Sequence, residues 1–265
     1  MVNVMRANGF PMRVSDNSMG GEAGQFHTTR WTLVRASAQD QNQTGREALA
    51  TLCQIYWYPL YAFARRRGYA QHEAQDLTQG FFLHLLERRA LGRADPLKGK
   101  FRSFLLASFQ NFLVDAAEMA RRLKRGGNCE MIFLDAQDAE SRYVLEPTDN
   151  LTAENIFEAR WAMTLLTRAA DRLRAECAAL GEASRFEVLS AFVGVAEGQA
   201  PPSYEQVAKS LGIGVGAAKT LIHRFRKRYS AILRETIART VSDPAEIEEE
   251  VHALCAALAV AQGRI

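Results

Sequence analysis

Apolar residues recur every three or four positions over most of this 265-residue chain, which is the spacing of one face of an α-helix. The strict alternation that is typical of a β-strand is almost absent, and Met131–Leu134 is the one short strand candidate. Prolines at 96, 147, 201, 202 and 244 separate long stretches with helical spacing. The pattern therefore predicts an all-α protein.

The helical stretches form two blocks, which predicts two helical domains joined by an acidic linker. The first domain is expected over residues 26–128, which end at a glycine pair and an asparagine, and the second over residues 158–240. Residues 129–157 are the expected linker. Residues 1–25 are polar and Gly-rich, so we expect disorder there, and residues 241–265 are expected to form a C-terminal helical extension.

Charge is distributed unevenly, although the formal net charge is only +3. Residues 96–128 carry seven basic and two acidic side chains, and residues 201–239 carry eight basic and two acidic ones, which gives local charges of +5 and +6. Residues 129–160 carry eight acidic and two basic side chains, a local charge of −6 that is typical of a solvated linker. The two basic blocks favour a polyanionic partner, because phosphate binding releases condensed counterions.

Other features exclude several classes of protein. The four cysteines and five histidines are scattered without Cys-x-x-Cys or His-x-x-x-His spacing, so we expect no disulfide framework, metal or other cofactor. The longest apolar run, Ala253–Ala261, is about half of a bilayer span, and residues 1–25 lack the apolar core of a signal peptide. Paired carboxylates such as Glu73/Asp76 are expected on a polar, solvated helix face without a phosphate loop. We therefore expect a soluble, cytoplasmic protein that is not an enzyme and does not insert into a membrane.

Residues 203–237 predict a helix-turn-helix. Ser203 is an N-cap with Gln206 at capping-box spacing, and Gly212 supplies the turn. A second helix is expected from Val215 to about Ile237. Its apolar positions are expected to face the core: Ala218, Ile222, Phe225, Tyr229, Ile232 and Leu233. Its other face is expected to contact DNA: Lys219, Thr220, His223, Arg224 and Lys227. A structural helical hairpin with a solvated basic face is the alternative.

The first block carries two candidate partner surfaces. Within residues 72–87, polar groups and an exposed aromatic side chain are expected opposite the apolar stripe: Asp76, Gln79, Phe82 and Leu83. Within residues 101–125, aromatic and polar groups precede a basic end: Phe104, Asn111, Asp115, Arg121, Arg122, Lys124 and Arg125. An aromatic ring among cations suits single-stranded or distorted DNA, where bases stack on the ring. Ordinary helix packing is the alternative for both surfaces.

These segments, taken in order, resemble a sigma factor of the sigma-70 family, of the compact extracytoplasmic-function type with only regions 2 and 4. Gln75–Gln79 with Phe82 and Leu83 resembles the part of region 2 that grips the clamp helices of RNA polymerase. Phe101–Leu105 with Asn111, Asp115, Arg121 and Arg122 resembles the strand-separating, minus-ten-reading segment. Tyr204–Ala208, Leu211–Ile213 and Gly216–Arg226 resemble region 4. The chain departs from the family pattern at three positions: Gly80 for Glu, Phe104 for Trp and Leu221 for Arg.

The resemblance implies a fold and a mechanism. Residues 26–128 would form the region 2 bundle, which docks on core RNA polymerase through Asp76, Gln79, Phe82 and Leu83 and opens the minus-ten element. Residues 158–240 would form the region 4 helix-turn-helix, which reads the minus-thirty-five element. The implied partners are core polymerase, promoter DNA and a regulatory protein such as an anti-sigma factor. A helix-turn-helix regulator that acts without core polymerase is the main alternative, and an adaptor without promoter activity is another.

Overall fold

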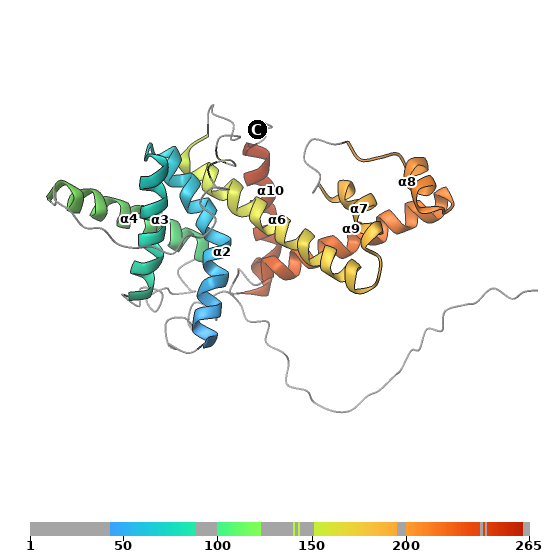
Figure 1. Ribbon diagram of the computed structural model, residues 1–265, viewed down its shortest axis with the longest axis horizontal. Helices are drawn as coiled ribbons and strands as arrows, with labels where there is room; N and C mark the ends of the chain where they lie inside the picture. Colours follow the sequence, from blue (N-terminus) through green and yellow to red (C-terminus); the bar gives the residue numbers. More distant parts are fainter. Residues whose placement is uncertain are drawn as a thin grey trace, which may run out of the picture.

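The computed structural model describes residues 43–87, 100–122, 140, 143, 151–194, 200–238, 241 and 243–261. These residues form eight α-helices, two short 3₁₀ helices and no strand, which confirms the predicted all-α class (Figure 1). The strand candidate at 131–134, the expected disorder of residues 1–25, and Lys124 and Arg125 all lie outside the described residues.

The helices follow one another with short connections in the second half of the chain. Their bounds are α2 (Gln43–Arg66), α3 (Gln71–Glu87), α4 (Phe101–Arg122), α6 (Ala153–Ala179), α7 (Ala183–Leu189), η3 (Ser190–Val193), α8 (Tyr204–Leu211), α9 (Val215–Ala238), η4 (Pro244–Glu246) and α10 (Ile247–Ala261).

A first core lies where α2, α3, α4 and the beginning of α6 meet. It is rich in aromatic rings, and Tyr56, Phe81, Phe109 and Trp161 are at most 1% exposed. The aromatic segment of α2 contributes four buried residues to this core: Trp57, Leu60, Tyr61 and Ala64. Burial of such large rings contributes much of the stability of a helical core.

Helix α6 connects this first core with a second one. Its first half places Phe157 and Trp161 in the first core, and its second half places Leu173 and Cys177 among α7, α8 and α9. At 27 residues the helix is about 40 Å long, and Figure 1 shows it running from one group of helices to the other. The expected boundary between residues 157 and 158 therefore falls inside a continuous helix that both cores share.

Two acidic side chains of residues 129–160 contact residues around the first core. Glu140 accepts hydrogen bonds from Tyr61 and from Arg65, whose Nη2 lies 2.7 Å from Glu140 Oε1. Glu158 Oε2 lies 2.7 Å from Arg102 Nε. Within the segment expected to be solvated, these two carboxylates are ion-paired and only 20% and 30% exposed, and their basic partners lie 56 or more residues earlier in the chain.

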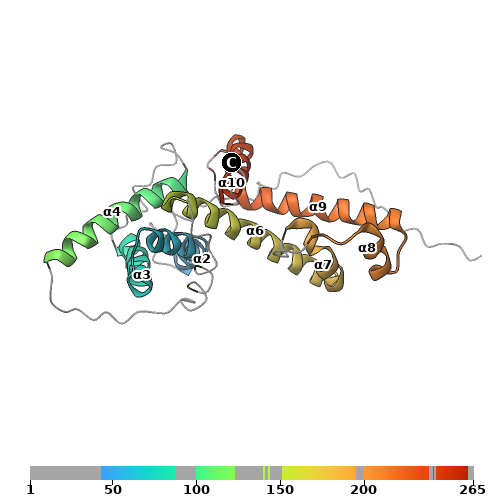
Figure 2. The ribbon, with the colours of Figure 1, turned by 90° about the horizontal axis from the view of Figure 1, so that it is seen from above.

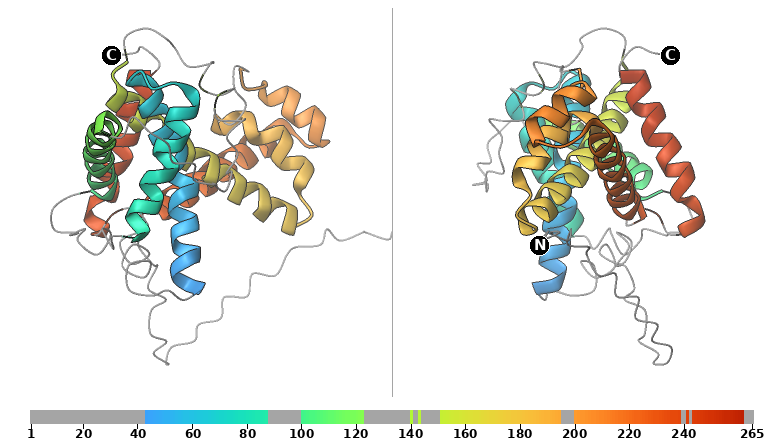
Figure 3. Two further views of the ribbon diagram at one scale, coloured as in Figure 1. Left: turned by 60° about the vertical axis from the view of Figure 1, so that its left-hand side comes forward. Right: turned by 90° about the vertical axis from the view of Figure 1, so that its right-hand side faces the viewer.

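The end of the chain returns to the first core. Ile237 at the end of α9 and Leu254 of α10 are buried in it, and Asp243 accepts a hydrogen bond from the Ala245 N–H as the chain turns into η4. Figure 2 shows α10 beside the junction of α6 and α9, and the right-hand view of Figure 3 shows it on the outside of the molecule. The helix expected in residues 241–265 is therefore present and packed.

Candidate nucleic-acid interface

Helices α8 and α9 form the predicted helix-turn-helix with the predicted cap and turn. The Gln206 N–H donates to Ser203 Oγ at 3.2 Å, and the Ser203 N–H donates to Gln206 Oε1 at 2.7 Å, which completes a capping box. Gly212 ends α8 with φ +64°, a left-handed conformation that favours glycine. The turn is closed by the Ile213 N–H, which donates to the Ala208 carbonyl at 3.0 Å.

Small side chains allow the two helices to cross closely. Ala208 is 5% exposed and Ala218 is completely buried between them. The apolar face of α9 continues through Ile222, Phe225 and Tyr229, which are at most 8% exposed. These residues fix the rotation of α9 about its axis, so the opposite face must point outward.

All five residues predicted to contact DNA lie on that outward face and are exposed: Lys219, Thr220, His223, Arg224 and Lys227. Within the part of the chain that the structure describes, none of the three cations Lys219, Arg224 and Lys227 forms a salt bridge. Their charge is therefore available to an anionic partner.

Two polar side chains of this face also have contacts within the motif. Lys219 Nζ lies 5.5 Å from the centre of the Tyr204 ring, a cation–π contact. Thr220 Oγ1 donates to the Gly216 carbonyl at 3.1 Å and can still accept a hydrogen bond. The pKa of Glu205 is lowered, first by its own backbone hydrogen bond, then by Ser203 and, more weakly, by the charge of Lys219.

An open cavity of about 570 Å³ adjoins the face between α7, α8 and α9. Arg224 and Thr220 line it from α9, and Ser210 lines it from α8. Ser184 and Arg185 line it from α7, where Arg185 is already paired with Glu182. Guanidinium groups and hydroxyls are the side-chain groups that commonly contact phosphate oxygens. The surface beside α9 is thus both concave and rich in donors.

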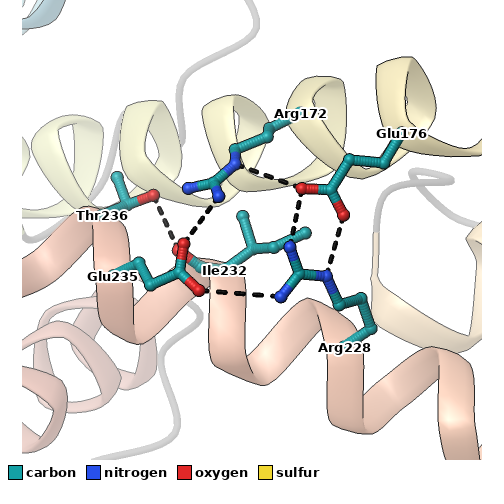
Figure 4. A network of polar contacts seen from close by, with 6 residues as sticks. All are labelled: Arg172, Glu176, Arg228, Ile232, Glu235 and Thr236. Atoms are coloured by element: carbon teal, nitrogen blue, oxygen red, sulfur yellow. Dashed lines mark hydrogen bonds and ion pairs between the residues drawn. The ribbon is translucent and has the colours of Figure 1, made fainter. Parts of the chain in front are cut away.

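The second half of α9 carries cations that the fold has already paired. Arg228 donates to Glu176 of α6 at 2.7 and 2.8 Å, and Arg234 Nε lies 3.0 Å from Glu248 Oε1 of α10. In Figure 4, Arg172, Glu176, Arg228 and Glu235 form one alternating network between α6 and α9. These hydrogen bonds lower the pKa of Glu176 and raise that of Arg228. The local charge of +6 therefore overstates the charge available for binding.

The four residues predicted to bind core polymerase do not form one exposed surface. Asp76 and Leu83 are exposed, Leu83 to 46%, and Gln79 is partly buried. Phe82 was expected to be an exposed aromatic, and this is wrong, because it is only 7% exposed. It follows Phe81 by one position, about 100° around the helix, and its ring lies 5.9 Å from the Phe81 ring at the edge of the same apolar face.

The residues predicted to bind and melt minus-ten DNA are described only in part. Asn111 and Asp115 are exposed on α4, whereas Phe104 is partly buried, with its ring 6.2 Å from that of Phe101. Arg121 and Arg122 belong to the last turn of α4, and their side chains lie outside the described residues.

Sequence reasoning missed two apolar residues on the same outward face. Val114 is 56% exposed and Met119 is 61% exposed. The sequence could have indicated their exposure, because at helical spacing they lie beside the polar residues Asn111, Asp115 and Glu118.

Comparisons with protein-family models, with curated proteins and with solved structures found no match to this chain. No helix of the described segments has the length and apolar character that crossing a membrane requires. Within those same segments, no group of three or more His, Cys, Asp or Glu side chains is arranged to hold a metal ion.

Proposed function

We propose that this chain is a sigma factor that binds core RNA polymerase and directs promoter recognition and opening at the start of transcription. The observation that carries the proposal is the exposed face of α9, whose cations Lys219, Arg224 and Lys227 form no salt bridge with a described residue. This helix follows the capped helix α8 after a tight turn. In this proposal the partners are core polymerase, promoter DNA and a regulatory protein such as an anti-sigma factor, and the protein acts in the cytoplasm.

The geometry of α9 supports a specific mode of DNA contact. A helix-turn-helix inserts its second helix into the major groove with its N-terminal residues near the base edges. Lys219 and Arg224 would then donate to guanine or phosphate oxygens, and Lys227 would contact phosphate further along the helix. The cavity lined by Arg224 and Arg185 provides room for a backbone phosphate beside the groove.

In the same proposal, α4 and α3 serve promoter opening and polymerase binding. The outward face of α4, with Asn111, Asp115 and Met119, would contact the separated strand, where polar groups read base edges and apolar groups contact unstacked bases. Asp76 and Leu83 of α3, both exposed, would contact core polymerase.

Transcription by purified core polymerase from a library of promoters tests this function. We expect the chain to stimulate a subset of promoters, and the triple variant Lys219→Gln/Arg224→Gln/Lys227→Gln to lose that stimulation. Arg174→Gln/Arg228→Gln/Arg234→Gln is a matched control, because it also removes three charges, from exposed arginines that are already paired with Asp171, Glu176 and Glu248. Absence of stimulation at every promoter, with the chain shown to be folded by circular dichroism, would contradict the proposal.

A helix-turn-helix regulator that acts without core polymerase is the second candidate. The burial of Phe82 favours this candidate, because a buried Phe82 is not available as one of the four residues expected to bind polymerase. This candidate predicts selective binding to a double-stranded operator by the chain alone. Asp76→Asn and Leu83→Ala would leave such binding unchanged, whereas they would weaken binding to core polymerase if the first proposal holds.

A further inference from the structure

The acidic first turn of α10 contacts the cations at the start of α4. Lys100 Nζ lies 2.9 Å from Glu250 Oε2 and 3.0 Å from Glu249 Oε1, and Arg102 Nη1 donates to Glu250 Oε1. Glu250 is 1% exposed, a degree of burial that carboxylates rarely reach unless they are paired. The contact joins residues that are 148 positions apart in the chain.

The two cations belong to the basic block that was predicted to face DNA, but they differ in how many of their partners lie on α10. Arg102 also donates to Glu158 at 2.7 Å and lies 4.4 Å from the centre of the Trp161 ring, so it keeps two partners when Glu250 is removed. The described partners of Lys100 are both on α10, and its side chain is 25% exposed. Lys100 is thus the cation that would lose all of its described ion-pair partners if α10 were released.

The rest of α10 holds this turn in place with a shallow apolar face. Only Glu250 and Leu254 of the helix are buried, while Ile247, Val251 and Leu258 pack against the first core from its edge. Glu248 pairs with Arg234 of α9, so the same turn contacts both α4 and α9. A 15-residue helix is marginally stable by itself and depends on such packing, so loss of its ionic contacts favours its release.

We propose that α10 is an autoinhibitory clasp, in which Glu249 and Glu250 occupy Lys100 and Arg102 in place of nucleic-acid phosphate. The proposal rests on the proposed function to the extent that nucleic acid is the competing polyanion. While α10 is docked, it also contacts the end of α9 through the pair of Glu248 with Arg234, and Ile237 of α9 is buried in the same core as Leu254 of α10. Phosphate and the carboxylates of α10 then compete for Lys100, so phosphate binding there favours release of α10.

Equilibrium binding of the full chain to a random-sequence DNA duplex, measured at several salt concentrations, tests the clasp. We expect Glu250→Gln to bind about tenfold more tightly than the wild type at low salt, and to steepen the salt dependence by about 0.9 for each additional phosphate that the protein binds. Glu249→Gln should show a smaller increase in affinity, because Lys100 retains Glu250. Glu246→Gln is the matched control, since it removes an equal charge from an exposed position one turn away.

Hydrogen exchange gives a second, independent measurement. DNA should make the amides of residues 247–261 exchange about tenfold faster in the wild type, because local opening of α10 accompanies binding. Glu250→Gln should show the faster exchange without DNA. If Glu250→Gln folds poorly, Glu249→Gln carries the test, since the Glu249 side chain is 72% exposed.

Equal binding by all three variants, slower exchange of α10 in the presence of DNA, or no binding by any folded variant would each overturn the clasp. Failure of the proposed function is seen in a different assay, as absence of stimulation of core polymerase. A stronger binding of Glu250→Gln to DNA without such stimulation would therefore reject the sigma-factor proposal and retain the clasp.

Discussion

The two halves of α9, residues 215–227 and 228–238, both carry cations but differ in what most of those cations contact. In the first half, Lys219, Arg224 and Lys227 are exposed and form no salt bridge with any described residue. In the second half, Arg228 is bound to Glu176 of α6 (Figure 4). Arg234 is bound to Glu248 of α10. The difference lies in the neighbouring helices, because the C-terminal part of α6 presents Glu176 beside the second half of α9 and α10 presents Glu248.

This contrast separates two uses of positive charge in one helix. Exposed ion pairs contribute little to stability, typically less than about 1 kcal/mol each, but they orient one helix against another. Cations without a carboxylate partner remain available to a polyanion. Local net charge alone does not distinguish the two cases, whereas the pattern of pairing does.

The largest expected effect comes from removing the unpaired cations. The triple variant Lys219→Gln/Arg224→Gln/Lys227→Gln should lose about three phosphate or base contacts, which would reduce the salt slope of DNA binding by about 2.7 and the affinity by about hundredfold. The double variant Arg228→Gln/Arg234→Gln should change affinity by less than about threefold, because those side chains are already paired. Filter binding or fluorescence anisotropy with one duplex measures both.

Equal losses in the two variants would show that pairing in the free protein does not decide which cations bind DNA. Thermal unfolding of both variants provides the control for folding. An effect confined to the double variant would reverse the assignment of the two halves.

A smaller effect is expected from disturbing the close crossing of α8 and α9. Ala218→Leu adds three carbons to a fully buried position and should lower the free energy of unfolding by about 1–3 kcal/mol. Ala217→Leu adds the same atoms at the neighbouring, exposed position and should change it by less than about 0.5 kcal/mol. Denaturant titration distinguishes them, and equal destabilisation by both variants would mean that the crossing is not closely packed.

The helix-turn-helix could be predicted from the sequence because its determinants are local. Ser203 and Gln206 are three residues apart, Gly212 marks the turn, and the apolar spacing of α9 fixes which face is buried. The five residues of the outward face follow directly from that spacing. Such features depend on helix geometry, which the order of residues reveals without knowledge of distant contacts.

The remaining features depend on contacts between distant segments, which periodicity does not report. Arg228 meets Glu176 across 52 positions, and Arg102 meets Glu250 across 148. Phe82 is buried because α3 is covered over a wider arc than one apolar stripe. The beginning of α6 at Ala153, before the expected boundary, is an exception, since Thr152 caps it locally by accepting a hydrogen bond from the Asn155 N–H at 3.1 Å.

The smallest expected effect concerns the pH dependence of the paired half of α9. Arg228, and more weakly Arg172, hold the pKa of Glu176 below its usual range. A carboxylate with a lowered pKa stabilises the fold above its unfolded pKa, and this contribution is lost as the pH falls through the lowered value. Wild-type stability should therefore decrease between about pH 5 and pH 3. Glu176→Gln should show less of that decrease, and it should be less stable than the wild type by under about 1 kcal/mol at pH 7.

The control is Glu187→Gln, which replaces an exposed glutamate of α7 and should follow the wild-type pH profile. Chemical unfolding at a series of pH values measures the difference, and identical profiles for wild type and Glu176→Gln would mean that the ion pairs of Glu176 with Arg228 and Arg172 do not contribute to folding.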